Sequence, residues 1–264
     1  MRTVVAIGAA FLIGLYAFAA PGPEREVLYQ ASVLDALLAG GYEGMITIAD
    51  IKTRGDLGIG TFDGLDGEMV MDRGVVYQIK HDGKVVVAPD RATSPFAIAT
   101  FLDPDQTFEI KGIAGMAELL SALKTRIQAP NHFYAIRIEG EFASVKTRSV
   151  PAQLKPYPPL AEVLKSQAVF DFGSLRGTIV GFYCPPYVGG VNLAGFHLHF
   201  ISEDKKSGGH LLDLKLIKAA AVLDQTPTIL LELPKNQSFQ QINFEPNPKS
   251  IRGLDNAAGI GPQL

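Results

Sequence analysis

Three histidines in one short stretch, GFHLHFISEDKKSGGH, are the residues of this chain best suited to bind a metal. His197, His199 and His210 lie close together, although the 264-residue sequence holds only five histidines. Imidazole nitrogens bind Zn²⁺, and a zinc site with three protein ligands keeps a position open for a substrate, whereas structural zinc sites are closed by four ligands. The cluster therefore predicts a catalytic type of metal centre, provided that the fold brings the three rings together.

A β-hairpin would bring the three rings together. Successive side chains of a strand alternate between faces, so His197 and His199 share one face and the apolar residues around them take the other. The polar segment SEDKKSGG suits a hairpin loop, and a loop centred on residues 204–205 places His199 opposite His210. Facing residues in such a pair have Cβ atoms about 4.5–5.5 Å apart. The alternative interpretation is that H-x-H is two polar residues on a solvated strand face.

Composition limits the classes of function. The chain is 47% hydrophobic, which suffices for one large domain or two small ones. Its formal net charge of −3 and its lack of basic runs argue against a nucleic-acid partner. Cys184 is the only cysteine, so the chain has neither an intrachain disulfide nor a zinc site built from several thiolates.

The first residues have the features of a targeting segment. Arg2 precedes the apolar run VVAIGAAFLIGLYAFAA, and AFA at residues 17–19 suits a small-residue cleavage site. We predict a signal peptide over residues 1–19, export to the periplasm or the medium, and no stable membrane association after cleavage. An uncleaved anchor helix is the alternative, since the run approaches the roughly 17 residues that a membrane span requires.

The elements that position the histidines are expected in two domains, residues 24–150 and 151–264. In the first domain, helical spacing of apolar residues predicts two helices, over 24–41 and 112–130. Alternation predicts a strand over 42–50, and Asp82-Gly83 predicts a hairpin turn. Residues 132–150 are predicted to form a second strand pair that turns at Glu139-Gly140.

The segment PAQLKPYPPL, residues 151–160, marks the expected boundary between the halves because proline cannot donate to a strand ladder. Strand-like runs follow at 173–187, 194–202, 209–223 and 226–233. Hairpin signals outnumber strand–helix alternations, which disfavours a doubly wound parallel sheet. The predicted fold class is α/β of the mixed α+β kind, with mixed or antiparallel sheet and flanking helices in both domains.

Around the histidine hairpin the chain resembles the alpha-acetolactate decarboxylase family. Three segments carry the resemblance: GFYCPPYVGGVNLAGFHLHFISEDKKSGGHLLD, GDLGIGTFDGLDGEMVMDRGVVYQ and TRSVPAQLKPY. It covers nearly everything between the leader and Pro234. The resemblance implies a two-domain fold, a homodimer, and a zinc ion held by His197, His199 and His210.

Further motif residues of that family fall on Thr61, Glu68 and Arg148, and the resemblance implies that they take part in catalysis. Without the resemblance, Glu68 would be interpreted as an ordinary acidic residue in a turn, and Arg148 as a surface residue on a strand. The family also has an acidic residue near its carboxyl end. The nearest counterpart here is Asp255, to which the divergent tail FEPNPKSIRGLDNAAGIGPQL gives no firm role.

The implied reaction is the metal-dependent conversion of (S)-2-acetolactate to (R)-acetoin and carbon dioxide. Loss of carbon dioxide leaves electrons on carbon, so a Lewis acid at the ketone is required. Glu68 is the expected proton donor or relay, and Arg148 the expected partner of the substrate carboxylate. Two alternatives remain: a cupin-like metalloenzyme acting on another small oxyacid, and a non-catalytic metal-binding protein. Histidine ligands suit Zn, Fe, Ni and Cu alike, so zinc follows from the resemblance alone.

Overall fold

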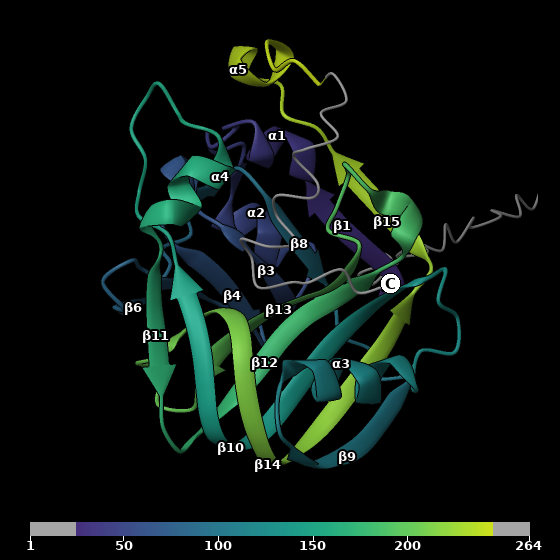
Figure 1. Cartoon of the computed structure of the whole chain (residues 1–264). Helices are drawn as coiled ribbons and strands as arrows, with labels where there is room; N and C mark the ends of the chain where they lie inside the picture. The colour runs from purple at the N-terminus through teal and green to yellow at the C-terminus, as the bar shows by residue number, and fades with distance from the viewer. Residues whose placement is uncertain (1–24, 245–264) are drawn as a thin grey trace, which may run out of the picture.

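Two β-sheets packed face to face form the body of the computed structural model, which describes residues 25–244 (Figure 1). The first sheet has the strand order β15-β1-β8-β3-β4-β5-β6. Its strands are β1 (Val27–Ala31), β3 (Leu57–Thr61), β4 (Glu68–Asp72), β5 (Val75–Ile79), β6 (Val85–Val87), β8 (Ala97–Thr100) and β15 (Thr228–Glu232). Only the β1–β15 pair among them is parallel.

The second sheet is antiparallel and has the strand order β11-β10-β12-β13-β14-β9. Its strands are β9 (Gln106–Ile113), β10 (Phe133–Ser149), β11 (Ala168–Phe172), β12 (Leu175–Cys184), β13 (Gly195–Ser202) and β14 (Gly208–Thr226). β10 also pairs with β14, so the pairings β10–β12–β13–β14–β10 close a ring. A separate two-stranded sheet joins β2 (Ile46–Thr47) to β7 (Thr93–Ser94).

Helices are short and flank the sheets. The α-helices are α1 (Leu34–Leu38), α2 (Ile48–Lys52), α3 (Met116–Lys124), α4 (Leu160–Val163) and α5 (Gln237–Gln240); the 3₁₀ turns are η1 (Asp63–Leu65), η2 (Leu164–Ser166) and η3 (Pro186–Val188). Figure 1 shows α3 lying against the second sheet, and α1 and α4 near the first. No helix within residues 25–244 is long and apolar enough to cross a membrane.

A buried apolar cluster joins the two sheets. It combines Leu28, Ile59 and Val70 of the first sheet with Phe182 and Ile201 of the second. Because side chains alternate along β13, the face that carries Ile201 also carries His197 and His199. The histidines therefore point toward the first sheet, into the space between the two layers.

The fold class predicted from the sequence, mixed α+β with sheets in both halves, is confirmed, and so are several elements. The hairpin at Asp82-Gly83 joins β5 to β6, and the central helix forms as α3. All four strand-like runs of the second half form strands, β12 to β15.

Three local predictions were wrong. Residues 27–31 form β1 and not the start of a helix, because they pair on both sides, with β8 and β15. Residues 42–50 contain only the two-residue β2, since Thr47 caps α2 by accepting a hydrogen bond from the Asp50 amide. Residues 133–149 form the single strand β10, which passes through Gly140 without a turn.

Gly140, which the sequence predicts at a turn, instead permits close packing of two strands. A Cβ at this position would collide with the Lys218 carbonyl and with Ala219 on the neighbouring strand β14. Glycine is therefore required by the approach of two backbones and not by a turn.

The two sheets do not divide the chain at residue 150. β9 and β10 of the first half belong to the second sheet, and β15 of the second half belongs to the first. The domain boundary stays a prediction. The predicted signal peptide and Asp255 lie outside the described residues.

Candidate metal centre

One row of side chains crosses the second sheet and contains most of the predicted site. The strand register pairs His199 with His210, and His210 with Arg148. Paired residues project from the same face of a sheet. His197 lies two positions from His199 on β13 and shares that face. The predicted hairpin, with His199 opposite His210, is therefore confirmed.

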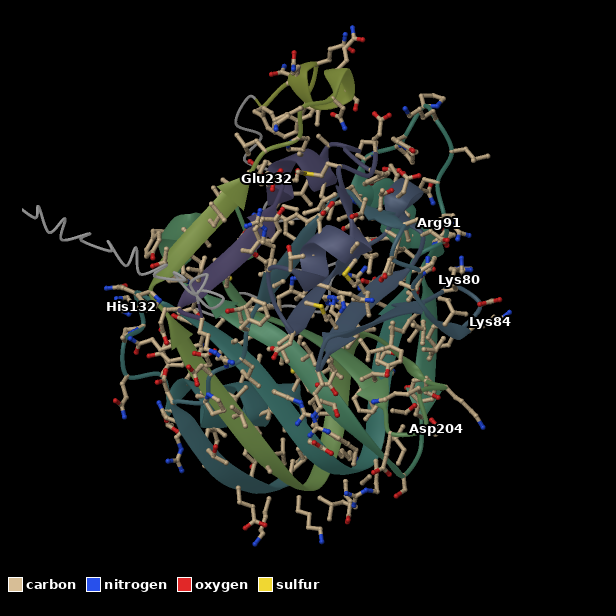
Figure 2. The ribbon with its side chains drawn as sticks, turned by 180° about the vertical axis from the view of Figure 1, so that it is seen from behind. Lys80, Lys84, Arg91, His132, Asp204 and Glu232 are labelled. Atoms are coloured by element: carbon tan, nitrogen blue, oxygen red, sulfur yellow. The ribbon has the colours of Figure 1, made fainter. Side chains whose placement is uncertain are left out.

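The hairpin turn is stabilised by its own polar side chains. The Ser202 hydroxyl donates to Asp204 and accepts hydrogen bonds from the amides of Lys206 and Ser207. Figure 2 shows Asp204 near the margin of the molecule. The polar residues of the loop thus fix the register that places His210 across from His199.

The three imidazoles converge on one point. His199 Nε2 lies 3.2 Å from His197 Nε2 and 3.3 Å from His210 Nδ1. One nitrogen from each ring lies within 4.8 Å of the other two. Two ligands at about 2.0–2.1 Å from a metal and separated by a tetrahedral angle lie about 3.3 Å apart. The two distances from His199 Nε2 therefore fit a tetrahedral metal ion.

A backbone carbonyl sets the tautomer of His199. Its Nδ1 lies 2.8 Å from the Met69 oxygen, which can only accept a hydrogen bond. Nδ1 must therefore carry the proton, and the lone pair of Nε2 faces the other two rings. Histidine ligands of metals commonly donate their second N–H in this way.

Burial keeps the three rings neutral. Desolvation, with a further contribution from the Arg148 charge, lowers the pKa of His197 to about 3. The pKa values of His199 and His210 are lowered well below the usual range, again mainly by burial. Neutral imidazole is the form that binds metals, so the site is prepared for a cation.

The first sheet contributes the acid. Glu68 opens β4, is buried, and places Oε2 3.6 Å from His199 Nε2. Burial raises the pKa of this carboxyl to about 7, although the Arg148 charge acts in the opposite direction. Glu68 is therefore a carboxyl that can hold a proton near neutral pH.

Thr61 lies opposite Glu68 in the β3–β4 pair. Its hydroxyl donates to the Gly67 carbonyl at 2.7 Å and fixes the turn that leads into Glu68. Thr61 also lines the pocket, and its oxygen can still accept hydrogen bonds.

Arg148 completes the polar set and is buried. Its Nη1 donates to Gln167 Oε1 at 3.3 Å, whereas its buried Nε has no partner among the described residues. Desolvation lowers the pKa of the guanidinium, and the Glu68 charge opposes that shift. Arg148 is thus a buried cation with N–H donors that remain available for a ligand.

The remaining wall of the pocket is aliphatic. The three histidines, Thr61, Glu68 and Arg148 line one pocket, so all six predicted site residues lie together. Apolar side chains from α1, α4 and nearby loops enclose it, among them Leu34, Leu38, Phe96, Val150, Leu160 and Leu193. Sequence reasoning missed these leucines, Gln167 and the Met69 carbonyl. Helical spacing of Leu34 and Leu38 was the only available signal.

The two remaining histidines and the cysteine lie outside this pocket. His81 contacts the Ser166 carbonyl, and His132 contacts Gln225. Figure 2 shows His132 at the opposite edge of the molecule from Lys80 and Lys84. Cys184 is buried, which raises the pKa of its thiol, and it packs in the apolar core.

The chain is similar to known proteins over most of its length. The family model described as alpha-acetolactate decarboxylase matches residues 28–246. An alpha-acetolactate decarboxylase of Methanosarcina mazei is 47% identical over 84% of this chain and 77% of its own length. One from Klebsiella aerogenes is 38% identical over 92% and 94%.

Solved structures agree with the sequence matches. The crystal structure of alpha-acetolactate decarboxylase from Bacillus subtilis superimposes with a TM-score of 0.85 at 38% identity, covering 88% of this chain and 99% of that one. A Staphylococcus aureus protein described as similar to alpha-acetolactate decarboxylase gives a TM-score of 0.84 at 29% identity, over the same shares.

Proposed function

This chain belongs to the alpha-acetolactate decarboxylase family, and we propose that it converts (S)-2-acetolactate to (R)-acetoin and carbon dioxide with the help of a zinc ion. It is an enzyme, a carbon–carbon lyase of the carboxy-lyase class. The observation that carries the metal-dependent part of the proposal is the row His199–His210–Arg148. Together with His197 it puts three imidazole nitrogens beside a buried cation.

The metal is assigned to His197, His199 and His210. A zinc ion bound there would supply a Lewis acid for the substrate's ketone oxygen. The protein's own part is to hold three neutral nitrogens close together, with the His199 tautomer fixed by Met69. His199 Nε2 lies at tetrahedral spacing from a nitrogen of each of the other two rings.

Arg148 binds and orients the substrate carboxylate. The planar guanidinium offers parallel N–H donors that match a carboxylate. An orientation of the carboxylate perpendicular to the ketone plane lets the breaking C–C bond feed its electrons into the carbonyl. The aliphatic wall accepts the two methyl groups and excludes water from the reacting carbon.

Glu68 delivers the proton that replaces carbon dioxide. Its carboxyl enters from the first sheet, whereas the histidines and Arg148 come from the second. A proton delivered from one side only gives a single enantiomer of the product. The Thr61 hydroxyl, held by Gly67, positions the turn before Glu68 and can accept a hydrogen bond from a substrate hydroxyl.

The proposed reaction is tested with an acetoin colour assay on the purified chain supplied with 2-acetolactate. We expect acetoin with zinc present, none after chelation, and recovery after zinc is restored. Acetoin production that survives complete removal of metal would contradict the proposed metal dependence. Bound metal without acetoin would favour a different oxyacid or a non-catalytic role.

A homodimer is proposed through β15, the edge strand of the first sheet. Within the described residues β15 pairs only with β1, and Ile229 and Leu230 are exposed on it. An edge strand that exposes apolar side chains is a template for pairing with a second copy. Leu230→Lys should give monomers in light scattering, whereas Leu154→Lys, at an exposed leucine outside the strand, should leave dimers. A dimeric Leu230→Lys protein would refute this interface.

Export by a signal peptide over residues 1–19 is also proposed, from the apolar leader and its small-residue cleavage site. Amino-terminal sequencing of the protein from fractionated cells tests it. A first residue near Ala20 in the exported fraction supports the proposal, and an intact Met1 refutes it.

A further inference from the structure

Two arginines of β10 are equally buried but differ in their partners. Arg137 and Arg148 are each 8% exposed. Arg137 donates from Nε to Asp72 Oδ1 at 2.7 Å and from Nη2 to Asp72 Oδ2 at 3.3 Å, and its Nη1 reaches Glu139 at 2.7 Å. Its charge is fully compensated by carboxylates, as is usual for a buried arginine.

Arg148 has no carboxylate in direct contact, although the charge of Glu68 acts on it from a greater distance. No carboxylate of the described residues lies within 4.0 Å of it, and its hydrogen-bond partner among those residues is the neutral amide oxygen of Gln167. Its Nε is buried and has no partner within residues 25–244. A buried donor without an acceptor is destabilising, so a ligand that supplies the acceptor is expected there.

Gln167 lies where it can orient the guanidinium without neutralising it. It stands between η2 and β11, two residues before Val169, which pairs with Arg148 across the β10–β11 ladder. A glutamate in the same place would differ by one atom and would carry the counter-charge that Asp72 gives to Arg137. The neutral residue therefore leaves the positive charge of Arg148 in the pocket.

We propose that Gln167 is a positioning residue that holds Arg148 through a neutral acceptor and so reserves its charge for the carboxylate of the substrate. The pocket thereby selects an anionic ketol acid and releases a neutral product that has lost the carboxylate. This inference rests on the proposed function, since it assigns the carboxylate of that substrate to Arg148.

Three variants test the role of Gln167. Gln167→Glu supplies a competing carboxylate, and Gln167→Met removes the acceptor without adding charge. Gln128→Glu changes the net charge equally at an exposed position that does not line the pocket. Calorimetry on the zinc-loaded proteins measures the affinity for 2-hydroxyisobutyrate, a carboxylate, and for acetoin, which is neutral. Thermal unfolding of each variant is measured in parallel.

For Gln167→Glu we expect the carboxylate to bind roughly 10- to 100-fold more weakly, because the charge of Arg148 is already neutralised. Acetoin affinity should stay within about twofold, and Tm should equal or exceed that of the wild type, since a new ion pair forms. Gln167→Met should lose less affinity for the carboxylate than Gln167→Glu, and Gln128→Glu should behave like the wild type.

Two results for Gln167→Glu would overturn the inference. One is wild-type affinity for 2-hydroxyisobutyrate, and the other is an equal loss of affinity for 2-hydroxyisobutyrate and acetoin together with a lower Tm. The second result would indicate a purely structural role. The binding assay does not depend on turnover, so failure of the proposed decarboxylation is recognised separately by the absence of acetoin from the wild-type enzyme.

Discussion

Replacement of Arg148 by lysine keeps the positive charge but removes the planar, forked set of N–H donors. The effect on catalysis can therefore be estimated from the hydrogen bonds that are lost. The guanidinium has five N–H donors, of which one is used by Gln167. Lysine offers a single point charge in place of two parallel donors and leaves Gln167 Oε1 without its partner.

The expected loss is about one charge-assisted hydrogen bond. Such a bond contributes about 1.5–3 kcal/mol, and each 1.4 kcal/mol is a factor of about ten. For Arg148→Lys we therefore expect kcat/KM to fall about 10- to 150-fold in the acetoin assay, with metal content unchanged. Arg137→Lys is the matched control, because Arg137 is equally buried on the same strand and lies outside the pocket. It should lower stability but leave kcat/KM within about twofold.

Two results would refute this reasoning. Wild-type kcat/KM in Arg148→Lys would show that the fork geometry is not used. Loss of metal together with activity would show that Arg148 supports the histidine cluster and not the substrate.

Three further predictions concern the acid, the glycine and a buried carboxyl. Glu68→Gln should lower kcat at least about 100-fold with little change in metal content, because the proton donor is lost; near-normal turnover would exclude that role. Gly140→Ala should lower the free energy of unfolding, measured in urea, by about 1–3 kcal/mol, because the added Cβ would collide with the backbone of β14. Asp224 is buried and its pKa is raised from 3.8 to about 7, mainly by desolvation. The folded state then holds this proton more tightly than the unfolded state, so stability falls as pH rises through that interval. In urea unfolding at pH 5 and pH 7.5, Asp224→Asn should gain stability over the wild type mainly at the higher pH; an equal difference at both values would exclude this linkage.

The sequence was most informative where structure is local. Alternation along β13 and the polar loop after it were enough to predict that His199 faces His210, because a hairpin register depends on neighbouring residues only. The turn at Asp82-Gly83 and the helix α3 follow from short-range signals in the same way.

The features that the sequence did not predict depend on contacts between distant parts of the chain. Val27–Ala31 is a strand because β8 and β15 pair with it from distant parts of the chain. Gly140 has the sequence features of a turn residue, but the structure shows that it is required because β14 packs closely against it. The contact between Met69 and His199 joins residues 130 positions apart and uses a backbone oxygen, which no side-chain pattern reveals. Glu68 and Arg148 were placed in the site by motif resemblance, because they come from different sheets.

Metal stoichiometry tests the central claim most directly. The account predicts about one zinc per chain in the wild-type protein, almost none in His199→Ala, and a wild-type value in His132→Ala, where the removed imidazole lies outside the cluster. Full zinc content in His199→Ala, or a metal-free wild-type protein that still forms acetoin, would contradict it.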